Sequence, residues 1–256
     1  LSDAIDDSAK GRKAHTHGDA YIADGTHFDG SGDYITIDNF AYSSDGQFSV
    51  GMWFTKESCS GNIYEYLFSH ANINSQDGFS TPTGNEHPAN PNVHMYIGCE
   101  HSGGGWSTKG GTIIRYNIFD DKGTAVMFDY PAWNAKSFSA VTNVWIHSIM
   151  VVDKSAVSMF INGERVSDSL FGFFNNGNGA TGGIPFECHN NAGCNQQTGK
   201  ASLAHLNKPL DTITMKTDIF LGGRYDSNHD RHFKGKLAGV TVSSGPMTPK
   251  QCTCVY

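Results

Sequence analysis

The stretch that decides the fold is residues 218–251, DIFLGGRYDSNHDRHFKGKLAGVTVSSGPMTPKQ. It contains a short apolar run at 219–221 that ends at a Gly-Gly pair, and a longer run at 233–242 bounded by Ser, Gly and Pro. Apolar runs between clusters of Gly, Asn, Asp and Ser are typical of strands. Helix formation is indicated after them, because Thr248 can accept a free amide of the first turn and Gln251 can bond back. We therefore expect a strand, an acidic loop, a strand and a short helix.

Two further stretches extend this pattern over nearly the whole chain. One is FDGSGDYITI at 28–37, followed by FSVGMWF at 48–54, and the other is WIHSIMV at 145–151, followed by SMFINGE at 158–164. In this order, with the LGG strand, the acidic loop and the final strand, they resemble laminin G-like and pentraxin-like domains of the concanavalin A-like lectin and glucanase superfamily. The resemblance implies an all-β fold, a two-sheet antiparallel jelly-roll sandwich with long loop insertions.

The remaining strands follow from period-2 alternation and from turn signals. Val50, Met52 and Phe54 alternate with small or polar residues, which predicts a strand that is covered on one face. The Asn162-Gly163 pair predicts a hairpin with a type I′ turn. Trp145 lies within a predicted strand, so we expect it in the core. We expect the other strands at 20–23, 25–29, 33–38, 47–55, 63–69, 93–98, 112–118, 124–129, 136–139, 144–153 and 156–161.

The chain is long enough for one domain with a full core. Residues 1–19 are polar, and we expect a poorly ordered N-terminal arm there, followed by a single sandwich domain over 20–256. Residues 168–212 form a long, irregular segment of the kind that carries binding in rigid scaffolds. The formal net charge is −7 with no basic run, which argues against nucleic-acid partners, and no apolar run is long enough for membrane insertion.

The cysteine pattern favours a secreted, extracellular protein. Six cysteines are present, and Cys188 and Cys194 enclose a short loop rich in Asn and Gly, so a local disulfide is the interpretation we prefer. A zinc site at this loop is the alternative, although the spacing matches no common zinc pattern. Cys252 and Cys254 are too close in the chain for an unstrained mutual bridge.

The acidic turn after the LGG strand is a candidate calcium site. Asp226, Asn228 and Asp230 supply oxygen ligands at alternate positions. In pentraxin-like domains, which the chain resembles, further ligands come from the loop after an earlier strand. That loop is residues 72–78 here, and Asp77 is its matching carboxylate. The alternative is that these residues make polar turns without an ion.

Four residues are candidate ligand contacts. Arg224 and Tyr225 stand where the pentraxin pattern has acidic or amide ligands, so the resemblance supports at most one calcium ion. We assign both residues to ligand binding. His229 can hydrogen-bond a ligand or make binding sensitive to pH. Trp106 follows three glycines and can stack on a sugar ring. The alternatives are that His229 is merely solvated and that Trp106 folds back over the core edge.

Enzyme activity is not expected. A glycosidase needs two carboxyls that flank the scissile bond, and the six Glu residues are scattered with no E-x-D-x-E run. We expect instead a non-catalytic extracellular module that binds glycan, or a matrix or cell-surface partner in adhesion, with calcium as its cofactor. The alternatives are a self-assembling structural subunit of a filament or coat and, below it, a glycan-active hydrolase.

Overall fold

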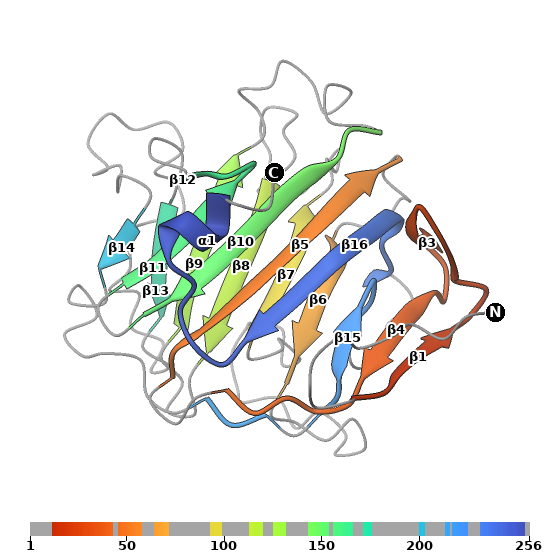
Figure 1. The fold of residues 1–256 in the computed structure, drawn as a ribbon, viewed down its shortest axis with the longest axis horizontal. Coiled ribbons are helices and arrows are strands. Elements are labelled where there is room, and N and C mark those ends of the chain that lie inside the picture. Colours follow the sequence, from red (N-terminus) through yellow and green to blue (C-terminus); the bar gives the residue numbers. More distant parts are fainter. Residues whose placement is uncertain are drawn as a thin grey trace.

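The structure is a computed structural model that describes residues 12–42, 46–57, 64–71, 93–98, 113–119, 125–131, 143–153, 156–165, 171–175, 200–202, 213–215, 217–224 and 231–253. Within these residues the protein is a two-layer antiparallel sandwich (Figure 1). This arrangement confirms the predicted all-β jelly-roll fold. No helix of the described part has the length and apolar character needed to cross a membrane.

One layer, which we call the β6 sheet, has eight strands within the described residues. In spatial order they are β1 (Ala14–His17), β4 (Tyr34–Ile37), β15 (Ile219–Leu221), β6 (Tyr64–His70), β7 (Val93–Gly98), β8 (Ile113–Phe119), β9 (Ala125–Pro131) and β13 (Phe171–Asn175). Strands from both ends of the sequence are therefore neighbours, because β15 pairs with both β4 and β6.

The other layer, the β5 sheet, lies in front of the β6 sheet in Figure 1. Its strands are, in spatial order, β12 (Glu164–Arg165), β11 (Ala156–Ile161), β10 (Ile146–Val152), β5 (Phe48–Lys56), β16 (Lys234–Ser243), β3 (Gly25–Asp29) and β2 (Tyr21–Ala23), with β14 (Lys200–Ser202) also paired to β11. The turn between β11 and β12 has positive φ at both Asn162 and Gly163, which confirms the predicted type I′ geometry.

The core lies between the sheets and follows the predicted alternation. Val50, Met52 and Phe54 of β5 are at most 2% exposed and point inward, and Met95 and Ile97 of β7 meet them from the other sheet. Each such side chain contributes roughly 1.5–3 kcal/mol on full burial. The alternate residues on these strands therefore occupy the two outer faces of the sandwich. On β5 this outer face is covered too, since Ser49 and Thr55 are 0% and 4% exposed, so the prediction of a strand covered on one face is wrong.

A short helix, α1 (Pro249–Thr253), covers one end of the outer face of the β5 sheet (Figure 1). Its start has the predicted capping box, since Thr248 N donates to Gln251 Oε1 at 2.8 Å and Gln251 N donates to Thr248 Oγ1 at 3.3 Å. The fully buried Cys252, a free thiol, packs on a second apolar cluster under this helix. The cluster also contains Ile149, Val151, Phe160 and Met247.

Three further sequence-based expectations need correction. The N-terminal arm predicted over 1–19 is too long, because β1 occupies 14–17 and pairs with β4. The segment 168–212 is not wholly irregular, because it contains β13 and β14. Trp145 is outside the core: it is half-buried, directly precedes β10 and packs on the backbone of Gly25.

Candidate functional site at the base of the β15–β16 loop

The loop between β15 and β16 carries most of the predicted ligand residues, and both of its ends are fixed. Phe233 N donates to Gly222 O at 2.9 Å and closes the base of the loop. Gly222 N donates in turn to Leu67 O at 3.2 Å, and Ser69 Oγ donates to Gly223 O at 3.2 Å. The start of the loop is therefore bonded to strand β6, and its end is bonded to its start.

Gly222, the first residue of the Gly-Gly pair at the start of this loop, is required by the geometry. Gly222 has φ of 75°, a left-handed conformation that favours glycine. A Cβ at this position would lie 2.3 Å from the ring of Phe28, so there is no space for a side chain. The LGG signature in the sequence thus marks the close approach between the loop base and the core.

Arg224 is the one predicted ligand residue that falls within the described part of the chain. It is 6% exposed, and its guanidinium carbon lies 5.9 Å from the centroid of the Tyr66 ring. Tyr66 belongs to a cluster with His94 and Tyr96, with ring centroids 5.3–5.6 Å apart. Met95, between the two β7 residues, points into the core, so this aromatic cluster lies on the outer face of the β6 sheet.

The aromatic cluster is closed to solvent although it lies on an outer face. Tyr66, His94 and Tyr96 are 3%, 0% and 5% exposed. In this position the cluster packs against the Arg224 side chain and holds the first residues of the loop. Sequence reasoning missed these three residues. The signal was available in the alternation of β7, where His94 and Tyr96 interrupt an otherwise apolar run of Val93, Met95 and Ile97.

A buried ion pair holds the other end of the loop. Lys56 on β5 donates to Glu65 on β6, and both side chains are at most 1% exposed. Glu65 Oε2 also accepts Lys234 N at 2.8 Å, while Lys56 Nζ donates to Lys234 O at 3.3 Å. Burial lowers the pKa of Lys56, and the Glu65 carboxylate opposes this effect. The pair therefore connects the two sheets and fixes the first residue of β16.

His232 adds a further contact at the same end of the loop. It is 1% exposed, and its Nδ1 donates to the carbonyl of Asp33 at 3.2 Å. Its ring also stacks on Tyr34, with centroids 6.2 Å apart. His232, which flanks the acidic turn, is thus a buried structural residue and not a solvated loop histidine.

Among the described residues, a cluster of three carboxylates has spacing compatible with a metal ion, and it lies outside the β15–β16 loop. Ligand oxygens of Asp19, Asp29 and Asp33 are within 4.8 Å of one another. However, Asp33 accepts Asp19 N and Asp29 N, each at 2.9 Å, so both of its oxygens already brace the backbone. Burial raises the pKa of the Asp33 carboxyl. The arrangement could hold a cation, but its hydrogen bonds are those of a braced turn.

The other predicted site residues lie outside the described part of the chain, and their roles stay predictions. They are the ligand contacts Trp106, Tyr225 and His229, the calcium ligands Asp77, Asp226, Asn228 and Asp230, and the cysteine pair Cys188 and Cys194. Asp226, Asn228 and Asp230 lie, with Tyr225 and His229, on the six-residue segment whose two ends are described above.

No protein-family model matches the sequence, and no curated protein matches it. Solved structures with the same fold include the binding domain of botulinum neurotoxin serotype G, with a TM-score of 0.60 and 13% identity, covering 98% of this chain and 47% of that chain. The receptor-binding domain of botulinum neurotoxin D has a TM-score of 0.59 and 14% identity, with coverage of 98% and 48%. The chain thus spans about half the length of these structures.

A further solved structure is domain 4 of AbnA, a GH43 extracellular arabinanase from Geobacillus stearothermophilus, in complex with arabinotriose. Its TM-score is 0.48 at 16% identity, and the match covers 96% of this chain and 87% of that chain. At the identities of the neurotoxin domains, the likeness establishes the two-sheet sandwich and leaves the ligand of this chain to be argued from its own residues.

Proposed function

We propose that this chain is a non-catalytic extracellular recognition module that binds glycan, or a matrix or cell-surface partner, through the β15–β16 loop. The observation that supports it most is the rigid base of that loop. Its start is held by Arg224 on Tyr66, its end by Lys234 on Glu65, and the two ends by the Phe233–Gly222 hydrogen bond. Functional residues are commonly placed on loops that a rigid scaffold positions.

A fixed base favours binding for an energetic reason. Association costs about 0.5–1.5 kcal/mol for each flexible side chain that becomes immobilised, so anchored loop ends lower the ordering cost. Tyr225 and His229 are the residues of this loop that we assign to ligand contact, with Arg224 at its base. Trp106 adds an aromatic ring for stacking on a sugar. Calcium, held by Asp226, Asn228, Asp230 and Asp77, would link this loop to the segment 72–78.

The buried carboxyl groups of the described residues favour binding over hydrolysis. A glycosidase needs one carboxyl that donates a proton and a second that acts as nucleophile or base across the scissile bond. Glu65 is engaged by Lys56 and Lys234 N, and Asp33 is engaged by two backbone amides. Of the neurotoxin domains that share the fold, one is named a receptor-binding domain and the other a binding domain, which also favours recognition.

The test is a glycan array and an extracellular-matrix protein panel, probed with the native chain and with Tyr225→Ala, His229→Ala and Ser244→Ala. Ser244 is an exposed residue after β16 and serves as the matched control. We expect binding that is weakened by the two loop variants and kept by Ser244→Ala. Ordered particles without any ligand dependence would favour the structural-subunit alternative, and sugar release from a bound glycan would favour hydrolysis.

A further inference from the structure

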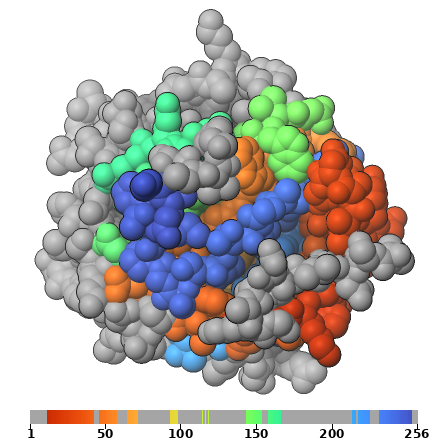
Figure 2. All heavy atoms as spheres, viewed as in Figure 1, coloured from red at the N-terminus to blue at the C-terminus, as the bar shows by residue number. Residues whose placement is uncertain are grey.

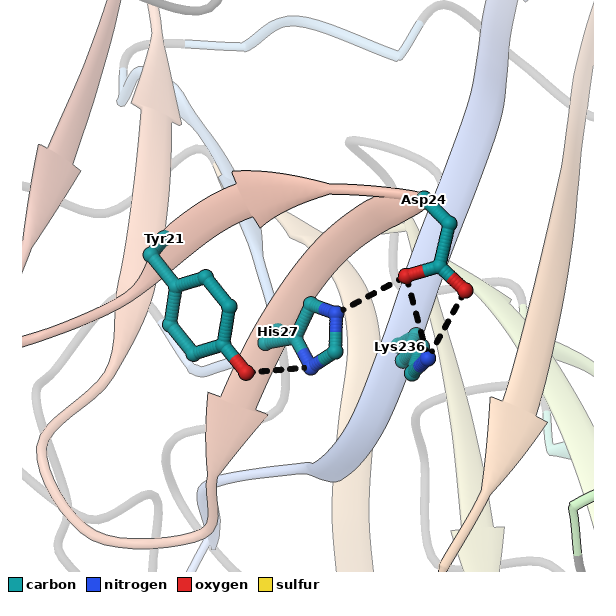
Figure 3. A network of polar contacts seen from close by, with 4 residues as sticks. All are labelled: Tyr21, Asp24, His27 and Lys236. Carbon is teal, nitrogen blue, oxygen red and sulfur yellow. Dashed lines mark hydrogen bonds and ion pairs between the residues drawn. The ribbon is translucent and has the colours of Figure 1, made fainter. Parts of the chain in front are cut away.

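The outer face of the β5 sheet carries an exposed polar network at the β2–β3 hairpin (Figure 3). Tyr21 OH lies 3.0 Å from His27 Nδ1, and His27 Nε2 lies 3.1 Å from Asp24 Oδ1. Lys236 Nζ donates to both oxygens of Asp24, at 3.1 and 3.0 Å. Because a carboxylate only accepts hydrogen bonds, His27 donates through Nε2 and accepts the Tyr21 hydroxyl through Nδ1.

Strand register places these residues side by side on one face. Tyr21 pairs with His27, His27 pairs with Lys236, and Lys236 pairs with Thr55. Leu237, the next residue on β16, points into the core, so Lys236 and its register partners are on the outer face. Strands lie about 4.8 Å apart, and the row from β2 to β5 is therefore roughly 14 Å long.

Unlike the aromatic cluster on the β6 sheet, this network is open to solvent. Tyr21 is 51% exposed, and the side chains of Asp24 and Lys236 are 70% and 23% exposed. One face of the Tyr21 ring stacks on His27, with centroids 4.3 Å apart and planes 15° apart. No second ring contact of Tyr21 occurs among the described residues, and half of the residue is exposed, so its other face can receive a ligand.

The same corner gathers the exposed apolar side chains. In the part of the chain that the structure describes, the large exposed hydrophobic residues are Tyr21, Ile22 and Val144. Val144 directly precedes Trp145, whose Cη2 lies 3.0 Å from the position of a Cβ on Gly25, next to Asp24. Figure 2 shows the N-terminal residues that include this hairpin, in red, beside the start of β10, in green.

We infer that this corner, formed by Tyr21, Asp24, Lys236 and Trp145, is a second saccharide-binding surface that takes a neutral oligosaccharide. An aromatic face suits the apolar C–H face of a pyranose ring, while a carboxylate and an ammonium accept from and donate to neighbouring hydroxyls. The surface carries one carboxylate and one ammonium, so it offers no net charge to a sulfated or phosphorylated sugar. It shares no residue with the β15–β16 loop.

The hydrogen bond from Lys236 lowers the pKa of Asp24, so the carboxylate is ionised at neutral pH, and Oδ2, which accepts from Lys236 alone, keeps a lone pair for a ligand hydroxyl. The orientation of the Asp24 carboxylate is fixed before a ligand arrives, because Lys236 and His27 already donate hydrogen bonds to it. A pre-oriented acceptor beside a free ring face is the arrangement that gives directional recognition of a sugar edge.

Calorimetric titration with linear hexose and pentose oligosaccharides, each in a neutral and a sulfated form, tests this inference. The proteins are the native chain, Tyr21→Ala, Tyr21→Phe, Asp226→Ala and the control Ser244→Ala. We expect a neutral oligosaccharide to bind, with a Kd raised about tenfold by Tyr21→Ala because the stacking partner is lost. Tyr21→Phe keeps the ring and should keep most of the affinity.

The loop variant separates the two sites. Binding that survives Asp226→Ala but is weakened by Tyr21→Ala supports the second surface even if the loop site fails. Equal affinity of the native chain and Tyr21→Ala, a preference for sulfated sugars, or no binding of any neutral oligosaccharide would overturn it. Self-association of the native chain that Tyr21→Ala abolishes would also overturn it, since the corner would then be a protein interface. Because Tyr21 is half exposed, equal melting temperatures of the native chain, Tyr21→Ala and Tyr21→Phe will verify the folding of the two Tyr21 variants.

Discussion

Lys56 and Lys236 occupy adjacent register rows of the same sheet, yet their ion pairs have opposite properties. Lys236 pairs with Thr55, and Lys56 pairs with Gly235, so the two side chains point to opposite faces. Lys56 meets Glu65 between the sheets at 1% and 0% side-chain exposure, whereas Lys236 meets Asp24 in solvent at 23% and 70%. The same pair of groups therefore fixes a loop base on one face and presents a recognition surface on the other.

Removing one member of each ion pair should give the largest difference in stability between the two sites. Glu65→Gln leaves the Lys56 ammonium buried without its counter-charge, and we expect a loss of about 3–5 kcal/mol in the free energy of unfolding. Lys236→Gln, the matched change in the exposed pair, should cost less than about 1 kcal/mol. Urea denaturation of both variants measures the difference.

The double variant Lys56→Met/Glu65→Gln checks the cause. Without either charge the desolvation penalty disappears, so its loss should be smaller than that of Glu65→Gln alone. Equal losses for Glu65→Gln and Lys236→Gln would contradict the difference in burial between the two pairs.

The next largest effect should be a loss of stability at acidic pH, caused by the buried His70. His70 is fully buried, its Nε2 donates to Thr217 O at 3.0 Å, and burial lowers its pKa from 6.5 to about 4. The unfolded chain takes up the proton near pH 6.5 and the folded chain only near pH 4. The stability that neutral His70 contributes is thus complete above pH 6.5 and is lost as the pH falls towards 4, by about 3 kcal/mol.

Denaturation midpoints measured between pH 7 and 4 test this slope. His70→Gln should lower stability at pH 7 but flatten the decline below it, because no buried imidazole remains to be protonated. The control Ser244→Ala should keep the native slope. If stability depends on pH in the same way in His70→Gln and in the native chain, other groups cause the acid sensitivity.

The next prediction concerns calcium binding by the loop residues that lie between the two fixed ends. If one ion joins Asp226 and Asp77, calcium at a hundred times its Kd should add about 2.7 kcal/mol to the free energy of unfolding. Melting in excess calcium and in chelator should differ for the native chain, and Asp226→Ala and Asp77→Ala should remove most of the difference. Identical melting temperatures of the native chain in both conditions would contradict the proposed calcium site.

The smallest effect concerns the part of the β5 sheet that α1 covers. Thr248→Ala removes the cap of this helix and should cost about 1 kcal/mol. Because Cys252 is fully buried under α1 and burial raises the pKa of its thiol, loosening the helix should speed its alkylation. Mass spectrometry of the Cys252 peptide measures the rate, with Ser244→Ala as control. An unchanged rate would mean that α1 stays closed without its cap.

Local sequence signals determined much of the fold. The alternation of Val50, Met52 and Phe54 placed a strand and its core-facing side, and the structure confirms both, although the opposite side of this strand is covered as well. The Asn162-Gly163 turn and the Thr248–Gln251 cap are likewise confirmed, because each depends on residues within four positions of one another. Signals of this range act before the chain has a tertiary structure.

Only the tertiary structure decided which strands and side chains meet. Residues 14–17 lack a strand signal of their own and become β1 by pairing with β4. Trp145, which we expected in the core, packs on Gly25 instead. Glu65 receives its backbone partner from Lys234, 169 positions away. The sequence placed Arg224 at the candidate site, but its packing on Tyr66 depends on β15 and β6 being neighbours. Such contacts arise from the closure of two sheets over one core, which no local pattern records.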